Sequence, residues 1–361
     1  MAGWSAVTAA PRLSRLWWFA GPVLVALVVA IVVVAALPAP YVTLSPGGAR
    51  SVEPLVTVAA KEGGPEIDVD PASDGLLYLT VSSRTEPSGL LVLRGWLDDT
   101  VQVEPSAPFL GTQTPDENRA LNLALMADSQ DKARKVALER LGFEVKTTPT
   151  GAFLEDVDPS FPAAEVLRPG MTVVEAGGEE VKTKDDLIAA IQAAEPGDTL
   201  DLSVIPLGER TPEQVTATLG ERDDQPGEAV LGVTVVDHAT YDFPVDIRIE
   251  TGQVGGPSAG LAFTLAILDR MTPGRLTGDG RVAVTGTIEI DGSVGPVGGV
   301  EHKARAAIRE GATLMLVPSD EYAAAVAAAD GRLQVVAVDS LDEALAALEA
   351  HGGSGLPASP D

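Results

Sequence analysis

The chain has 361 residues and a formal net charge of −27 at pH 7, which makes binding to nucleic acid unfavourable. It has no cysteine, so disulfides, thiolate metal sites and a cysteine nucleophile are excluded. It has three histidines and no cluster of Asp, Glu and His with metal-ligand spacing, so we expect no metal and no other cofactor. The length predicts two or three folded units.

Residues 16–37 form the one long uncharged apolar run of the chain. A run of this length predicts a single transmembrane helix, and a signal peptide is the alternative. Arg12 and Arg15 precede the run, so the positive-inside rule places residues 1–15 in the cytoplasm. We therefore expect a single-pass protein of the cytoplasmic membrane whose folded domains are extracytoplasmic.

The sequence of residues 41–141 predicts a β-rich membrane-proximal region that ends in a helix. Short β-like runs lie at Leu76 to Val81 and at Leu90 to Trp96, and the region carries no chemical motif that we can name. Thr114 and Pro115 have the chemistry of a helix N-cap and a first helical position, so a helix or a pair of helices is expected from there to Leu141.

Residues 146–222 predict a separate small domain. Its distinctive motifs are Gly151-Ala152-Phe153-Leu154, Ser160-Phe161-Pro162-Ala163-Ala164, Leu167-Arg168-Pro169-Gly170 and Gly177-Gly178. The segment resembles a PDZ domain of the bacterial protease type, although Met171 stands where that family usually has Asp. The resemblance implies that Gly151, Ala152, Phe153 and Leu154 form a strand edge and amide loop that bind a peptide as an extra strand. The alternative is a small β domain that packs against its neighbour and binds no peptide.

A charged linker is expected at Glu221 to Glu228, followed by alternating strands and helices over 229–350 and a flexible tail over 351–361. Gly255, Gly256 and Pro257 break a strand at Asp246 to Glu250. The uncharged run from Ser258 to Leu268 then predicts a buried helix. Ser258 thus opens a helix, where unpaired backbone amides can stabilise an oxyanion. A simple N-cap is its alternative role.

Lys303 is the one charged residue on the apolar face of a second predicted helix. The other positions of this face are Val300, Ala304, Ala307, Ile308 and Gly311. Burial disfavours the charged amine and lowers its pKa, which makes a lysine a general base for a serine hydroxyl. Alternatively, the ammonium reaches solvent from the edge of the helix. His302 is expected on the opposite, solvated face.

A second resemblance rests on several blocks that occur in order. They are Gly256-Pro257-Ser258-Ala259-Gly260, Leu276-Thr277-Gly278, Val284-Thr285-Gly286, Gly295-Pro296-Val297-Gly298-Gly299-Val300 and Lys303. They resemble the proteolytic domain of Lon, peptidase family S16, and the whole chain resembles the membrane-anchored, PDZ-containing Lon-like proteases of Gram-positive and actinobacterial type. The resemblance implies a multidomain α/β chain that ends in an α+β domain of the ribosomal protein S5 domain 2-like fold.

The same resemblance implies roles for individual residues. Ser258 is the expected nucleophile, Lys303 its base and Thr285 the group that orients the lysine. The backbone around Gly256 and Pro257 is expected to stabilise the oxyanion that forms when the serine attacks the substrate. Lon has an acidic residue at the position of Gly255. This difference bears on the conformation expected for the loop before Ser258 and not on the Ser-Lys dyad.

The expected activity is an ATP-independent serine endopeptidase that cleaves unfolded or extended polypeptides, with the PDZ-like segment recruiting or gating substrate. The sequence has no Gly-x-x-x-x-Gly-Lys-Ser/Thr phosphate loop, so no ATP is expected. Homo-oligomeric rings are expected by resemblance only.

Two alternatives stay open at this point. The first is a non-catalytic, membrane-anchored PDZ adaptor or scaffold. The second takes Gly256 to Gly260 as the Gly-x-Ser-x-Gly motif of an α/β-hydrolase. Its acid and histidine would be Asp291 with His302, or Asp339 with His351.

Overall fold

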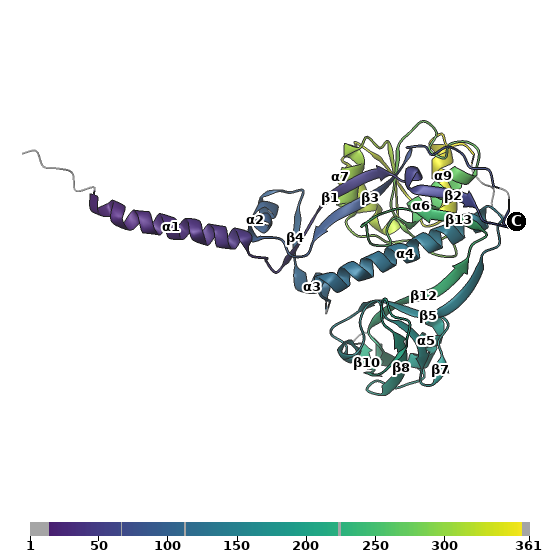
Figure 1. Cartoon of the computed structure of the whole chain (residues 1–361), viewed down its shortest axis with the longest axis horizontal. Coiled ribbons are helices and arrows are strands. Elements are labelled where there is room, and N and C mark those ends of the chain that lie inside the picture. Colours follow the sequence, from purple (N-terminus) through teal and green to yellow (C-terminus); the bar gives the residue numbers. More distant parts are fainter. Residues whose placement is uncertain (1–13, 66, 112, 223–224, 356–361) are drawn as a thin grey trace, which may run out of the picture.

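The structure is a computed structural model that describes residues 14–65, 67–111, 113–222 and 225–355; the side chains of 14–20, 36 and 225 are not described. The N-terminal end of the predicted cytoplasmic segment, 1–13, and the tail beyond 355 lie outside the described residues. Figure 1 shows a larger lobe of helices and sheet, a smaller β-rich lobe, and the helix α1, Ser14–Ala36, projecting from the larger lobe.

A six-stranded sheet forms the centre of the larger lobe, in the order β18-β17-β14-β3-β1-β4. Its strands are β1 Tyr41–Ser51, β3 Leu76–Arg84, β4 Gln102–Pro105, β14 Val282–Val284, β17 Leu314–Val317 and β18 Gln334–Ala337. The four strands from β18 to β3 run parallel, whereas β1 is antiparallel to both β3 and β4. Parallel neighbours imply burial on both faces, because crossover helices cover the sheet.

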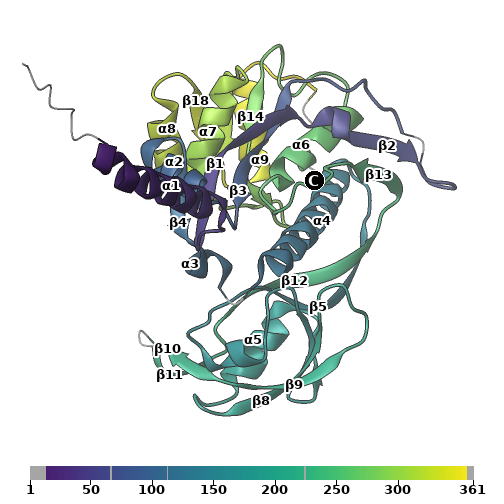
Figure 2. The same cartoon turned by 60° about the vertical axis from the view of Figure 1, so that its left-hand side comes forward.

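Helices cover both faces of this sheet. One face carries α4 Pro115–Arg140, α6 Gly260–Met271 and α9 Leu341–Ala350, and the other carries α7 Val300–Arg309 and α8 Tyr322–Ala329. Strand β3 shows the division directly, because Leu76 and Tyr78 pack with α6 while Leu77 and Leu79 pack with α7. Figure 2 shows α6 and α7 on either side of the central strands.

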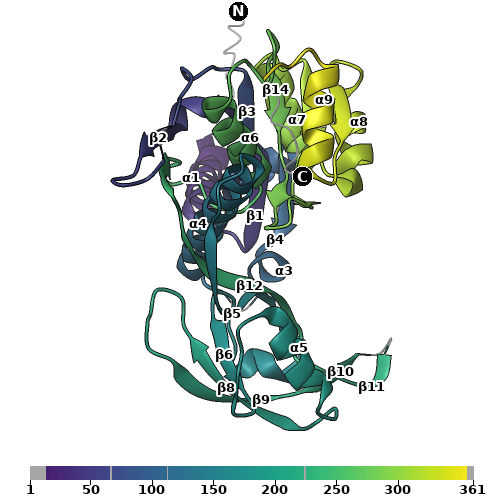
Figure 3. The ribbon, with the colours of Figure 1, turned by 90° about the vertical axis from the view of Figure 1, so that its right-hand side faces the viewer.

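A second sheet, in the order β12-β5-β6-β8-β9, forms the smaller lobe. Its elements are β5 Lys146–Val157, η2 Pro162–Glu165, β6 Thr172–Ala176, β7 Glu179–Glu180, α5 Lys184–Gln192, β8 Thr199–Ile205, β9 Glu213–Thr218 and β12 Val233–Asp242. The predicted linker at 221–228 is instead largely a hairpin of β10 Gly220–Arg222 and β11 Gln225–Val230. Strand β12 pairs with β5 over its whole length, and the two strands connect the lobes side by side (Figure 3).

Short elements complete the described chain. They are η1 Glu53–Leu55, β2 Val56–Ala60, α2 Gly89–Leu97, α3 Ser106–Leu110, β13 Val245–Ile249, β15 Thr287–Ile288, β16 Val294–Gly295 and η3 Ser319–Glu321. Strand β2 pairs with β13, which leads directly from β12 toward Ser258.

The region predicted as membrane-proximal and separate, 41–141, is part of the larger lobe. Strand β3 pairs with β14, and α4 packs against α6, so segments far apart in the sequence build one core. The run at 90–96, predicted as β-like, is the helix α2. The predicted start of α4 is confirmed: Thr114 and Glu117 form a reciprocal capping box before Pro115.

The predicted transmembrane helix at 16–37, and the single-pass membrane localisation that rested on it, are wrong. Within the described ranges, no helix combines the length and the apolar character needed to cross a bilayer. A span requires about 20 consecutive apolar residues. Although α1 covers Ser14–Ala36, its described side chains extend only over 21–35.

Candidate active site

The loop that carries Ser258 is held by the neighbouring helix α4. Gly256, in a left-handed conformation with φ of 90°, donates its N–H to the carbonyl oxygen of Asn122 over 2.7 Å. The hydroxyl of Ser129 donates to the carbonyl oxygen of Pro257 over 2.9 Å. Ser258 itself is half-buried and lies two residues before the first residue of the helix α6, whose N-cap is Ala259. The two bonds fix the loop on both sides of its glycine-proline step.

This geometry revises the predicted oxyanion site. The N–H of Gly256 already has an acceptor, and Pro257 has no N–H to donate. Among the described residues, the N–H of Ser258 has no acceptor. It lies at the positive end of the α6 dipole, where negative charge is stabilised. Among the described residues, the amides of Ser258 and Ala259 have no acceptor, so these donors, rather than the amide of Gly256, are free to bind an anionic oxygen.

Thr285 connects Lys303 with the backbone of Ser258. The Nζ of Lys303 donates to Oγ1 of Thr285 over 3.0 Å, and this hydroxyl donates to the carbonyl oxygen of Ser258 over 3.2 Å. The same carbonyl accepts the N–H of Gly286 over 3.1 Å. Thr285 directly follows β14, so the carboxyl end of a central parallel strand lies between the layers that carry α6 and α7. In the part of the chain that the structure describes, no direct hydrogen bond joins Nζ to Oγ of Ser258.

The amine of Lys303 is buried, as the helical pattern predicts. Only 2% of the residue is exposed, and burial lowers the pKa of Lys303 to about 8, while the charge of Glu321 opposes this shift. Glu321 also accepts the N–H of Val297 in the glycine-rich turn before α7. A lysine with a pKa near 8 has a substantial neutral fraction at pH 7 to 8, which is the state that a general base needs.

His302 is not on a solvated face, which corrects the prediction. The residue is 3% exposed, and neither ring nitrogen has a hydrogen-bond partner within the described ranges. Burial, helped by the charge of Arg305, lowers the pKa of His302. The helix that carries His302 packs against both α8 and β1.

The α/β-hydrolase alternative is not supported by these contacts. The carboxylate of Asp291 accepts from Ser293, and that of Asp339 accepts from Ser319. The ring of His351 pairs with the hydroxyl of Thr313 over 3.0 Å. Within the described part of the chain, neither proposed acid is hydrogen-bonded to a histidine, so these residues form no Ser-His-Asp arrangement.

The predicted peptide-binding strand of the smaller lobe is an interior strand. Gly151, Ala152, Phe153 and Leu154 lie in β5, which pairs with β12 on one side and with β6 on the other. A peptide adds only to a strand whose backbone groups are free on one edge. Residues 151–154 therefore offer no edge to a peptide.

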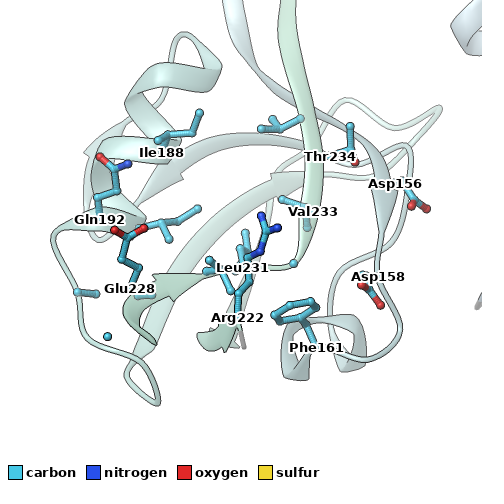
Figure 4. Close-up of a pocket in the computed structure, with 17 residues that line it drawn as sticks. Asp156, Asp158, Phe161, Ile188, Gln192, Arg222, Glu228, Leu231, Val233 and Thr234 are labelled. Carbon is cyan, nitrogen blue, oxygen red and sulfur yellow. The ribbon is translucent and has the colours of Figure 1, made fainter. Parts of the chain in front are cut away.

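The outer strands of this sheet are β12 and β9, and the edge of β12 lies beside the helix α5. A cavity of about 790 Å³ lies between this edge and the helix α5, with Ile188 and Gln192 facing Val233 and Thr234 across it (Figure 4). Asp237 of β12 accepts the backbone N–H of Lys184 at the start of α5 over 2.7 Å, so β12 and α5 are hydrogen-bonded to one another. We predicted this strand to belong to the following domain, because no local signal shows that it pairs with β5.

The larger lobe is a layered α/β domain with a buried lysine, and it is joined to a small β domain. Residues 232–350 match the Lon protease (S16) C-terminal proteolytic domain, and residues 139–216 match a PDZ domain. The chain therefore contains a Lon-type S16 proteolytic domain and a PDZ domain, which supports serine peptidase chemistry.

Individual relatives give the extent of the similarity. Lon protease 2 of Bacillus subtilis is 33% identical over 105 residues, which are 29% of this chain and 18% of that protein. Lon protease of Methylocella silvestris is 34% identical over 144 residues, which are 39% of this chain and 17% of that protein. The crystallised PDZ domain of the SdrC-like protein from Listeria monocytogenes is 30% identical and covers 25% of this chain and 93% of its own, with a TM-score of 0.23. This chain thus spans less than a fifth of the length of these two Lon proteases.

Proposed function

We propose that the chain is a serine endopeptidase in which Ser258 is the nucleophile and Lys303 its general base. The observation that carries the proposal is the buried amine of Lys303, held by Thr285 against the backbone of Ser258, with a pKa lowered to about 8. A serine hydroxyl alone is a weak nucleophile and needs a base of this kind nearby.

The proposed reaction has two halves. Oγ of Ser258 attacks the peptide carbonyl, its proton passes to the neutral Nζ of Lys303, and the amide N–H of Ser258 donates to the oxyanion. The amine returns this proton to the leaving nitrogen as the acyl-enzyme forms. Water then gives a proton to Lys303 while it attacks the ester, and the released serine recovers it. Thr285 keeps the amine on the side of the serine throughout.

We further infer that cleavage needs no ATP, since the chain has no phosphate loop. The substrates are unfolded or extended polypeptides, because a backbone must approach the loop at Gly256 closely. The competing function is a non-catalytic PDZ adaptor, which leaves the buried lysine beside the serine loop without a role.

Cleavage of casein or of a labelled peptide tests the proposal without added nucleotide. We expect Ser258→Ala and Lys303→Ala each to reduce kcat/KM by about a thousandfold or more, and their combination to cost no more than either alone. Ser83→Ala and Lys61→Ala, at exposed positions outside the site, serve as matched controls. Equal activity in all variants would exclude the dyad. An inactive wild type that still binds peptides would favour the adaptor.

We also propose that the edge of β12 binds the carboxyl-terminal end of a polypeptide as an added strand. The cavity beside α5 supports this proposal because it offers an apolar side-chain site next to a free strand edge. Ile188 lines this cavity and is 37% exposed, whereas Leu207 is 38% exposed elsewhere in the lobe. We expect Ile188→Asp to weaken peptide binding by about tenfold or more, through one lost apolar contact, and Leu207→Asp to leave it unchanged. Equal effects of the two variants in a fluorescence-anisotropy titration would contradict this site.

A further inference from the structure

A cavity lined by arginines lies on the larger lobe, away from both sites described above. Its volume is about 620 Å³, and it is bounded by β1, β3, α2 and α7, which lie near one another in Figure 2. The basic residues that line it are Arg84, Arg94, Arg305, Arg309 and Arg332. They come from four separate parts of the chain, so the fold rather than a local sequence run brings them together.

This concentration of positive charge contrasts with the rest of the chain. The whole sequence has a net charge of −27 and only 25 lysines and arginines, five of which line this one cavity. The only carboxylate in its lining is that of Asp98, which lies 3.9 Å from Arg94. The cavity is therefore a basic site in an acidic protein.

Most of these guanidinium groups lack an acidic partner. Arg309 donates to the backbone carbonyl of Gly47. Arg84, Arg305 and Arg332 form no ion pair and no side-chain hydrogen bond within the described ranges. Like charges gathered in this way repel one another unless an anion lies between them.

Hydroxyl groups complete the lining, from Thr43, Ser45, Ser82 and Thr100. Guanidinium forks and hydroxyl donors together match the oxygens of a phosphate group, which accept several hydrogen bonds at once. The volume falls within the range of small-molecule sites and exceeds what a single ion needs. We propose that this cavity binds a soluble small molecule that carries more than one phosphate group.

The site is separate from the proposed active site but shares one helix with it. Lys303 of α7 faces Thr285, whereas Arg305 and Arg309 of the same helix line the arginine cavity. An anion there would neutralise charge on α7 without touching Ser258. The proposal therefore stands whether or not the chain cleaves peptides.

The test uses the full chain and pyrophosphate as the probe, with titration calorimetry at low ionic strength. The double variant Arg84→Gln/Arg332→Gln removes two of the unpaired guanidiniums at exposed positions. The double variant Arg210→Gln/Arg248→Gln removes the same charge at exposed positions outside the cavity and serves as the control. Circular dichroism establishes that both are folded.

We expect wild type to bind pyrophosphate, the cavity variant to lose about tenfold or more in affinity, as loss of charge-assisted hydrogen bonds implies, and the control to stay within about twofold of wild type. Citrate, a multivalent carboxylate, should bind at least about tenfold more weakly than pyrophosphate. No binding by wild type, an equal loss in both double variants, or equal affinity for citrate would each overturn the proposal.

Discussion

In the proposed mechanism, the protonation state of Lys303 decides whether Ser258 has a base. Its folded pKa of about 8 lies below the ordinary value of 10.5, because burial disfavours the charged amine. Only the neutral amine accepts a proton, so activity should rise as pH increases through this value. We expect kcat/KM for a labelled peptide to rise with a midpoint near pH 8 and then to level off.

Glu321 provides a check on that assignment. Its charge raises the pKa of Lys303, so Glu321→Gln should move the midpoint of the pH profile to lower pH. Glu310→Gln, a charge change at the far end of the helix, is the control. An unchanged midpoint in the Glu321 variant would mean that another group controls the profile.

Thr285 is a positioning residue in this scheme, because it contacts Lys303 and the backbone of Ser258. Thr285→Val keeps the shape of the side chain but removes both hydrogen bonds, so we expect kcat to fall by about tenfold to a hundredfold. Thr285→Ser restores the hydroxyl and should recover most of the activity with the wild-type pH midpoint. Failure of serine to rescue would assign threonine a packing role only.

Sequence reasoning was strongest for single residues with unusual surroundings. The apolar stripe around Lys303 predicted its burial, and the structure confirms it. The burial of His302 could not be predicted from the same helix, because α7 packs against β1 on one side and α8 on another. One helical pattern reveals the most apolar face but not how many neighbours the helix has.

At the scale of elements, a pair of buried carboxylates joins η1 to the sheet and to α6. Glu53 accepts the N–H of Leu76 and the hydroxyl of Ser73, which also reaches Asp269. Burial raises the pKa of both Glu53 and Asp269, so the folded state favours their protonated forms. Their contribution to stability is therefore largest at low pH and is lost as pH rises through the folded pKa values.

Replacing the carboxyl group of Glu53 tests this pH dependence of the folding stability. Glu53→Gln keeps an oxygen acceptor for Leu76 and removes a buried charge, so we expect the protein to gain about 1 to 2 kcal/mol at pH 8. Little change is expected near pH 4, where the carboxyl is already protonated. Denaturant unfolding at both pH values measures the difference, and an equal change at both would mean that packing, not charge, dominates.

The elements most difficult to predict were those whose partners are distant in the sequence. The residues of β3 were predicted as a β-like run, but nothing local shows that they pair with β14. The same holds for β12, which pairs with β5 and thereby leaves residues 151–154 in an interior strand of the smaller lobe. Strand pairing over such separations is a property of the whole fold.

At the scale of the whole molecule, the smaller lobe is an insertion between α4 and β13. Lys146 and Asp242 are paired neighbours where β5 and β12 meet the larger lobe. A deletion of 148–240 with an Asn-Gly turn joining Thr147 to Tyr241 should therefore leave the larger lobe folded.

That variant separates the proposed roles of the two lobes. We expect it to cleave a short labelled peptide within about tenfold of wild type, since the contacts of Lys303 and Ser258 stay intact, and to lose binding of carboxyl-terminal peptides. Circular dichroism and a cooperative melt verify folding. A folded but inactive variant would show that the smaller lobe contributes to cleavage itself.

The central sheet contains strands that precede the smaller lobe in the sequence and strands that follow it, so the ribosome synthesises this sheet in two stages. Strands β1, β3 and β4 leave the ribosome before the smaller lobe, whereas β14, β17 and β18 follow it. The smaller lobe can close its own sheet as soon as β12 emerges, while α4 and β3 still lack the partners that bury their apolar faces. At this stage the smaller lobe of the nascent chain can be folded while the core of the larger lobe is still incomplete. Lys303 reaches Thr285 only when nearly the whole chain has been made.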